Sequence, residues 1–315
     1  MSLQRRKHLY FFTKCDSIIR SGWKIMTMIM KAIKKEAGQL SWLMAIFLGF
    51  VQGLTEFIPV SSSGHLAIFQ SIGLEDIHDR HLFFDVLLHM GTLVAVCAVY
   101  WKDIKDMFVS VVALFRGGRD KDGYPVENSK LRLVFLLVLG TLPLVLILPF
   151  QGAIEGLGNR MWFVGLMLLI TGGFLFFSDK LAQGRRGEGQ MTVKNAVFIG
   201  LLQCIGTLPG ISRSGITITG GLMGGLNRGF AVRYSFLLSL PAIFGANIVV
   251  LFRSMSDVDW SLMPRYLVGV LVAGITGYFA IHLVKRFVES GRFGIFAYWC
   301  WFIGLAAIIL SAFGF

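Results

Sequence analysis

The residues of this chain that could do chemistry are concentrated in one short segment, QGLTEFIPVSSSGH at 52–65. Gln52 and Glu56 are four residues apart, so on a helix they share one face and could hold a cation or a polar head group together. The turn that follows offers the hydroxyls of Ser61–Ser63 and backbone N–H groups that can bind an anion. His65 supplies an imidazole that exchanges protons near neutral pH. The segment therefore predicts acid–base or nucleophilic chemistry on an anionic substrate.

A second polar motif, PGISRSG, lies in the other half of the chain. Arg213 stands between Ser212 and Ser214, and Gly210 and Gly215 on either side let the backbone approach a ligand closely. The planar guanidinium fork of an arginine suits a pair of phosphate oxygens. This motif therefore predicts binding of a phosphorylated head group.

Each of these residues also has a structural interpretation. Glu56 could brace a broken helix, His65 could be a packed side chain, and serines in apolar helices usually bond back to their own helix. Arg213 could form a buried salt bridge to Glu56 or Asp85. Asp85 and His89 are also four apart, and they would either extend the polar site or lie solvated near a helix end.

The two motifs belong to an internal repeat. A shift of 151 residues without gaps aligns two sets of polar, glycine and aromatic residues: Phe47, Gly49, Gln52, Ser61, Ser63 and Gly64 with Phe198, Gly200, Gln203, Ser212, Ser214 and Gly215. In the same register the second copy replaces Glu56 by Thr207, Ser62 by Arg213 and His65 by Ile216. The two copies are therefore expected to contribute different chemistry to one shared site.

The elements that must position these motifs cross a membrane. Of the 315 residues, 55% are hydrophobic and only 15% are charged, against about 25% in soluble domains. Six apolar runs are long enough to span a bilayer, and two more, at 40–74 and 195–226, are broken by the polar motifs. The six runs are 83–101, 131–150, 161–178, 232–252, 265–283 and 295–313. We therefore expect an all-α polytopic membrane protein of two inverted repeats, with about six full transmembrane helices and two re-entrant broken helices.

The net charge of +12 does not indicate a nucleic-acid partner, because no basic face with interleaved aromatic residues is present. The loop charges instead indicate how the chain is oriented in the membrane. Residues 1–36 carry +7, and residues 1–39 are interpreted as a basic extension that is either disordered or a misassigned start, before one membrane domain at 40–315. Lys and Arg gather in alternate loops: 102–132, 179–194, 228–233 and 285–292. These loops are expected to be cytoplasmic, so 195–226 enters and leaves from that side. By the same count, 40–74 either enters and leaves from the outside or crosses from the inside, and the inverted repeat favours entry from the outside.

These motifs make the chain resemble a known family. QGLTEFIPVSSSGH and PGISRSG look like the two signature segments of the BacA-type undecaprenyl-diphosphatases of bacterial inner membranes, also called bacitracin-resistance proteins. The helix at 83–101 resembles the family's helix between them, and the likeness covers roughly 40–315. It implies hydrolysis of undecaprenyl diphosphate, a polyprenyl diphosphate lipid, to the monophosphate and inorganic phosphate. That reaction recycles the carrier lipid for peptidoglycan, at a site that opens to the periplasm, and confers bacitracin resistance.

The resemblance also implies roles for particular residues. The catalytic set is Glu56, Ser62, His65 and Arg213; the phosphate-binding set is Ser61, Ser63, Gly64, Ser212, Ser214 and Gly215. The family's (E/Q)xxxE motif falls on Gln52 and Glu56, which would hold an assisting divalent cation, Mg²⁺ or Ca²⁺. We interpret Ser62 as the nucleophile, with Glu56 or His65 taking its proton and Arg213 on the phosphate; His65 is the alternative nucleophile. Gln52 is glutamate in some members, and a neutral amide there should weaken a metal site.

Two other functions compete with this interpretation. A lipid transporter or flippase would share the inverted repeats and the membrane-lipid partner, although it would need no nucleophile. Acid-phosphatase-like lipid phosphatases also use a Ser-Gly-His turn, but Thr219 stands where they need a second histidine. A homodimer and the identity of the metal are left open.

Overall fold

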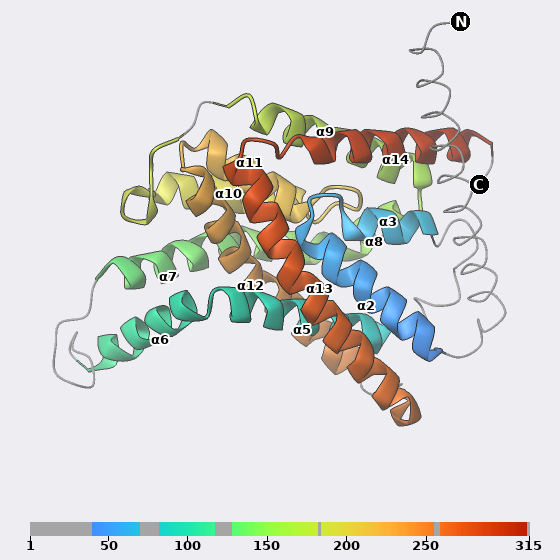
Figure 1. Cartoon of the computed structure of the whole chain (residues 1–315), viewed down its shortest axis with the longest axis horizontal. Coiled ribbons are helices and arrows are strands. Elements are labelled where there is room, and N and C mark those ends of the chain that lie inside the picture. The colour runs from blue at the N-terminus through green and yellow to red at the C-terminus, as the bar shows by residue number, and fades with distance from the viewer. Residues whose placement is uncertain (1–39, 70–81, 117–127, 182–183, 255–258, 314–315) are drawn as a thin grey trace, which may run out of the picture.

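The structure, a computed structural model, describes residues 40–69, 82–116, 128–181, 184–254 and 259–313. Within these residues every named element is a helix (Figure 1). The predicted basic extension at 1–39 lies outside the described residues.

The first half of the chain forms α2 (Trp42–Phe57), α3 (Ser62–Phe69), α5 (Leu82–Val99), α6 (Trp101–Phe115), α7 (Asn128–Thr141), the 3₁₀ helix η2 (Leu142–Phe150), α8 (Gln151–Gly158) and α9 (Met161–Ser178). The second half forms η3 (Glu188–Gln190), α10 (Val193–Ile205), α11 (Arg213–Met223), α12 (Arg228–Ser254), η5 (Trp260–Leu262), α13 (Met263–Glu289) and α14 (Ile295–Ala312).

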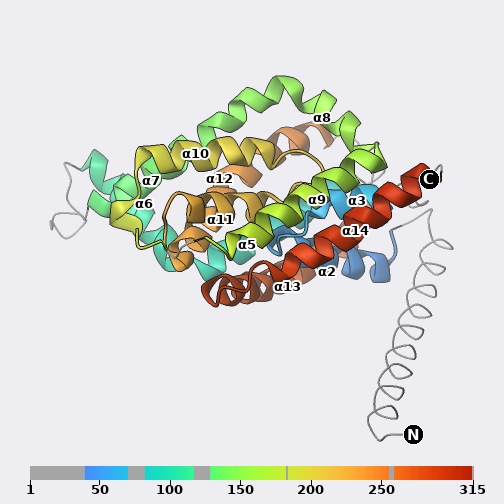
Figure 2. The ribbon, with the colours of Figure 1, turned by 90° about the horizontal axis from the view of Figure 1, so that it is seen from above.

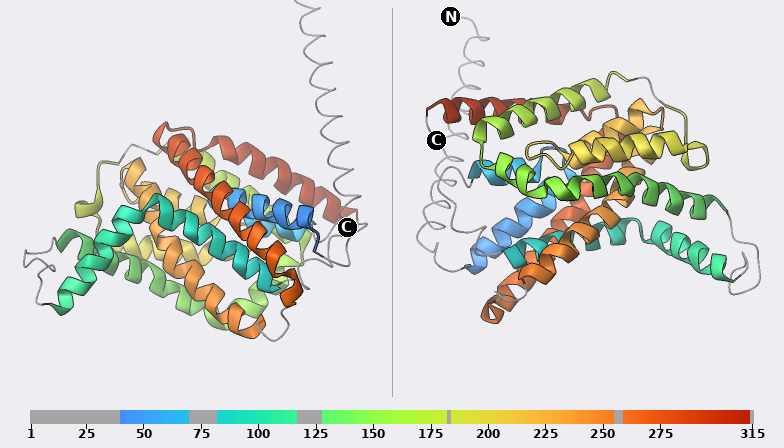
Figure 3. Two further views of the ribbon diagram at one scale, coloured as in Figure 1. Left: turned by 60° about the horizontal axis from the view of Figure 1, so that its bottom comes forward. Right: turned by 180° about the vertical axis from the view of Figure 1, so that it is seen from behind.

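The expected membrane spans are present, with one correction. Five helical segments of the described chain are long and apolar enough to cross a bilayer: Ser129–Ile154, Met161–Ser178, Arg228–Ile248, Trp260–Glu289 and Ile295–Ala312. The run at 83–101 ends in a bend of 84° into a further helix, α6, which continues from the end of α5 at an angle (Figure 3). The sequence analysis wrongly placed α6 in a loop, because charges at Lys102, Asp103, Lys105 and Asp106 hide an amphipathic helix.

Both broken segments are confirmed as helix–turn–helix units. α2 ends at Phe57, two residues before Pro59, which has no N–H to continue the ladder. α10 likewise ends before the Pro209 turn. Each unit resumes with a short helix, α3 or α11, directly after a serine.

Glycine contacts show that the two halves are related by an internal two-fold axis. A Cβ on Gly49 would lie 2.3 Å from the carbonyl oxygen of Gly269, and one on Gly200 would lie 2.4 Å from that of Gly140. Gly49 and Gly200 are equivalent in the 151-residue register, and Gly140 and Gly269 are equivalent after a shift of 129 residues. Each half therefore seats its broken helix against the other half in the same way.

The two-fold axis inverts one repeat relative to the other. α9 and α14 are equivalent helices and lie side by side (Figures 1 and 2). Gly165 of α9 lies against Gly304, whereas Gly172, further along α9, lies against Ala297, earlier in α14. Equivalent spanning helices are thus antiparallel, which supports the inverted arrangement expected from the sequence.

A cluster of four charges joins one end of the helix bundle, between α6, α7, η3 and α12. Lys130 Nζ lies 3.4 Å from Asp103 Oδ1 and 3.0 Å from Glu188 Oε1. Arg233 pairs with Asp103 and lies 2.9 Å from Glu188 Oε2. The four side chains are mostly buried, so each charge depends on its partners.

We expect Asp103→Asn to lower the free energy of unfolding by about 1–2 kcal/mol, because Lys130 and Arg233 would lose a shared, partly buried counter-charge. The measurement is the thermal midpoint of the purified protein in detergent. Asp106→Asn, on the same helix and without an ion pair in the described chain, is the matched control. Equal midpoints for the two variants would contradict the importance of the cluster.

Candidate active site

The site lies where the turns of the two broken helices meet. A Cβ on Gly64 would lie 2.9 Å from the Cα of Gly210, and one on Gly215 would lie 3.1 Å from the Cβ of Pro59. In the 151-residue register Gly64 is equivalent to Gly215, and Pro59 to Gly210. The contact between the turns is therefore two-fold symmetric, and a side chain at Gly64 would force the two backbones apart.

Serine side chains cap both short helices in the same manner. The Gly64 N–H donates to Ser61 Oγ at 3.1 Å, and the Gly215 N–H donates to Ser212 Oγ at 3.1 Å. The cap serines in turn lie 3.3 Å from Ser63 Oγ and 3.2 Å from Ser214 Oγ. These predicted phosphate-binding residues thus shape two helix N-termini, which are themselves anion-binding features.

The first turn also holds a strained residue. Ser61 has φ of 65° and is the one described residue other than glycine with a positive φ. A side chain in this region is disfavoured by about 1–3 kcal/mol and persists where surrounding contacts impose it. In the second turn, Gly210 takes a positive φ of 98° without that cost.

Two side chains that the sequence analysis missed bind the turn carbonyls. Thr171 Oγ1 donates to the Gly210 carbonyl at 2.9 Å, and Cys300 Sγ lies 3.6 Å from the Pro59 carbonyl. Thr171 and Cys300 are equivalent under the 129-residue shift, as their partners are under the 151-residue shift. No local motif marks either residue, so only knowledge of the repeat packing could have found them.

Glu56 is the centre of the polar site. Its side chain is 3% exposed, and its Oε1 pairs with the guanidinium of Arg213 from the other repeat. Gln52 Nε2 donates to Oε2 at 3.0 Å, which confirms that Gln52 and Glu56 share one helix face. The salt bridge that the sequence analysis kept as an alternative for Arg213 is therefore present.

His89 joins this carboxylate from α5. Its Nε2 lies 3.7 Å from Glu56 Oε2, while its Nδ1–H donates to the Asp85 carbonyl at 2.8 Å. Because Nδ1 carries a proton there, Nε2 is the ring nitrogen that faces the Glu56 carboxylate. Of the two outcomes left open for His89, the structure supports extension of the polar site.

His65 has different partners from those expected. Its Nδ1–H donates to the Ser61 carbonyl at 2.9 Å, and its Nε2 accepts the indole N–H of Trp299 at 3.0 Å. The indole nitrogen is only a donor, so the neutral ring carries its proton on Nδ1. Both nitrogens are occupied, and neither contacts Ser62 in the described chain. The structure thus does not bring together His65 and the nucleophile predicted for it.

Ser62, half-buried at the start of α3, makes no side-chain hydrogen bond within the described residues. A narrow pocket of about 10 Å³ lies instead beside Glu56 and Arg213. Its other lining residues are Phe57, Ser214, Thr217, Ser235, Phe236 and Ser239. Ser235 and Ser239 were missed, although hydroxyls four apart in an apolar helix were an available signal.

The donor set does not form a resident metal site. Among the described residues no group of three His, Cys, Asp or Glu side chains could hold a metal ion. Glu56 offers a single carboxylate, which Arg213 and Gln52 already occupy. Gln52 adds only a neutral amide. The expected divalent cation is therefore not accounted for by these residues alone.

Fold and site together define a class: a multi-pass membrane protein with inverted repeats and a buried carboxylate–guanidinium pair between their turns. The sequence model described as "Bacitracin resistance protein BacA" matches residues 45–306. The chain therefore belongs to the BacA family.

Curated relatives agree with this assignment. A protein of Halothermothrix orenii is 37% identical over 268 residues, covering 84% of this chain and 96% of its own. One of Methanosphaera stadtmanae is 39% identical over 281 residues, covering 86% and 99%. One of Desulfosudis oleivorans is 42% identical over 266 residues, covering 82% and 94%. All three are named undecaprenyl-diphosphatase.

We expect Trp299→Phe to make His65 reactive toward diethyl pyrocarbonate, because the change frees a lone pair at Nε2. The measurement is the rate of modification of His65, followed by peptide mass spectrometry, which should rise several-fold. Trp301→Phe is the matched control, since Trp301 lies on the same helix and donates to the Leu169 carbonyl. Equal rates in wild type and Trp299→Phe would show that Trp299 does not hold His65.

Proposed function

We propose that this protein hydrolyses undecaprenyl diphosphate to undecaprenyl phosphate and inorganic phosphate. The names of the relatives support the substrate and the reaction. The observation that carries the proposal is the buried pair of Glu56 and Arg213, set between two helix N-termini. A carboxylate, a guanidinium and free N–H dipoles at one point suit phosphoryl transfer.

Arg213 is the proposed phosphate ligand. Its side chain is 26% exposed, whereas that of Glu56 is 3% exposed, so the guanidinium is the more accessible partner. A diphosphate offers it a bidentate pair of anionic oxygens in place of the carboxylate. Arrival of the substrate would then release Glu56 from its cation.

Ser62 remains the proposed nucleophile, with His65 as the alternative. Its hydroxyl is not engaged by described residues, and in the repeat register it is the counterpart of Arg213. Ser62 Oγ would attack the terminal phosphorus, and the bond from that phosphorus to the bridging oxygen would break, releasing undecaprenyl phosphate. Glu56, freed from Arg213, would take the hydroxyl proton. Water would then attack the phosphoserine, the bond from phosphorus to Ser62 Oγ would break, and Glu56 would return its proton to Oγ as inorganic phosphate leaves.

A divalent cation is proposed to enter with the diphosphate, because Mg²⁺ is often held by one carboxylate together with substrate phosphate oxygens. Gln52 and Glu56 would face it, and the cation would neutralise charge on the phosphates. Activity in chelator should therefore fall and recover with added Mg²⁺ or Ca²⁺.

The proposed location is the bacterial inner membrane, with the site opening to the periplasm. The alternation of basic loops supports this orientation. The cellular role would be recycling of the carrier lipid for peptidoglycan, with resistance to bacitracin. The flippase alternative gains no support from the names of the relatives. A homodimer stays a hypothesis.

The test is phosphate release from undecaprenyl diphosphate by the purified protein in detergent. Arg213→Ala should lower the rate at least 100-fold, the usual order for removing a charge-stabilising group. Arg160→Ala, an exposed arginine between α8 and α9, is the control and should keep the wild-type rate. A wild-type protein that releases no phosphate, or an Arg213→Ala protein at full rate, would contradict the proposal.

The nucleophile is tested separately in the same assay. Ser62→Ala should lose most activity and should yield no phosphoserine after rapid acid quenching. Full activity of Ser62→Ala would overturn this assignment while leaving the phosphatase proposal intact.

A further inference from the structure

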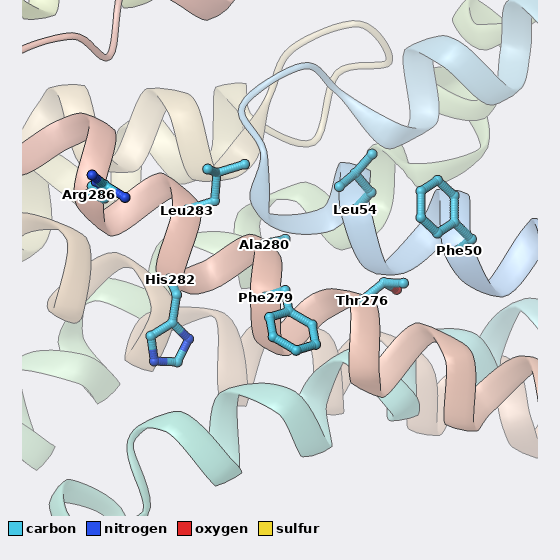
Figure 4. A pocket seen from close by; sticks show the side chains of 8 residues that line it. All are labelled: Phe50, Leu54, Thr276, Phe279, Ala280, His282, Leu283 and Arg286. Atoms are coloured by element: carbon cyan, nitrogen blue, oxygen red, sulfur yellow. The ribbon is translucent and has the colours of Figure 1, made fainter.

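A groove runs between α2 and α13 on the face of α2 that points away from the site. It has a volume of about 480 Å³ and is lined by Phe50, Leu54, Thr276, Phe279, Ala280, His282, Leu283 and Arg286 (Figure 4). Leu54 lies two residues before Glu56, which at about 100° per residue puts the two on nearly opposite faces of the helix. The groove is therefore separate from the phosphate site.

The groove is lined mainly by apolar side chains and has a cationic side chain near one end. Figure 4 shows Phe50 and Leu54 on α2 across from the side chains of α13, with Arg286 near one end. Arg286 is exposed and makes no salt bridge within the described residues. It lies in the last turn of α13, where the helix dipole favours a cation but leaves the guanidinium donors free.

His282, one turn before Arg286, contributes less to an anion site. Its Nδ1–H donates to the Tyr278 carbonyl at 2.9 Å, so in the neutral ring Nε2 can only accept a hydrogen bond. Arg286 is consequently the group that must carry an anion. A guanidinium binds phosphate with two parallel hydrogen bonds.

The residues that line this groove can be compared with their counterparts in the other repeat. Under the shifts that relate the two halves, the apolar lining keeps apolar equivalents: Phe50 matches Leu201, Leu54 matches Ile205, Phe279 matches Phe150 and Leu283 matches Ile154. The cations do not repeat, because His282 matches Ala153 and Arg286 matches Leu157. The charge is thus specific to the end of α13, beside the loop 285–292 that is expected to be cytoplasmic.

We propose that this groove binds one anionic phospholipid of the cytoplasmic leaflet, with its phosphate on Arg286 and an acyl chain along the apolar lining. The cytoplasmic leaflet carries anionic lipids and a negative surface potential, so it is complementary in charge to the Arg286 guanidinium. The substrate chain is a less suitable occupant, because its diphosphate belongs at Glu56 and Arg213, on the other side of α2. A bound lipid would brace the helix that carries Glu56.

The test is native mass spectrometry of the purified protein with dioleoyl phosphatidylglycerol or dioleoyl phosphatidylcholine. The wild-type protein should retain several-fold more phosphatidylglycerol than phosphatidylcholine. The Arg286→Gln protein should retain the two lipids equally. Lys285→Gln, the neighbouring exposed lysine outside the groove lining, is the matched control and should behave as wild type. Leu283→Trp, which fills the groove, should weaken retention of both lipids.

Equal retention of the two lipids by wild type, or an unchanged preference in Arg286→Gln, would overturn the proposal. Unchanged retention in Leu283→Trp would overturn it as well, since the charge would then act without the groove. Loss of undecaprenyl phosphate rather than phosphatidylglycerol in Arg286→Gln would show a different occupant. Thermal midpoints of the variants confirm that each is folded.

Discussion

The buried contact between Glu56 and Arg213 is the interaction on which the arrangement of this molecule depends. A carboxylate that is 3% exposed is costly within a membrane unless a cation and hydrogen-bond donors surround it. Here the cation comes from the opposite repeat, and Gln52 and His89 approach the second oxygen. The two halves must therefore meet at this point for either charge to be tolerated.

Symmetric packing makes an asymmetric site. Glycines seat both broken helices and both turns by equivalent contacts, and equivalent serines cap both short helices. The residues that carry charge break this symmetry, because Glu56 is matched by Thr207 and Arg213 by Ser62. Duplication thus supplies the scaffold, and divergence of a few positions supplies complementary groups. The two turns also differ in backbone conformation, because the positive φ falls on Ser61 in the first turn and on Gly210 in the second.

The sequence predicted those features that depend on local pattern. Pro59 and the Ser-rich motifs marked both helix breaks, the spacing of Gln52 and Glu56 gave their shared face, and the repeat register indicated that the turns meet. It missed partners that come from distant helices, namely Trp299 on His65 and Thr171 on the second turn. It also missed α6, where Asp103 pairs with Lys130 and Arg233 from distant parts of the chain. Such contacts depend on tertiary packing and leave no local signal.

The central claim is that Glu56 and Arg213 stabilise one another across the two repeats, and a double-mutant cycle on thermal stability tests it most directly. Glu56→Gln and Arg213→Gln should each destabilise the protein, because each leaves one buried charge without its partner. We expect the double variant to be at least as stable as the less stable of the two single variants. The coupling free energy between the two substitutions should then be about 1–3 kcal/mol. Additive losses, with coupling below about 0.5 kcal/mol, would contradict it.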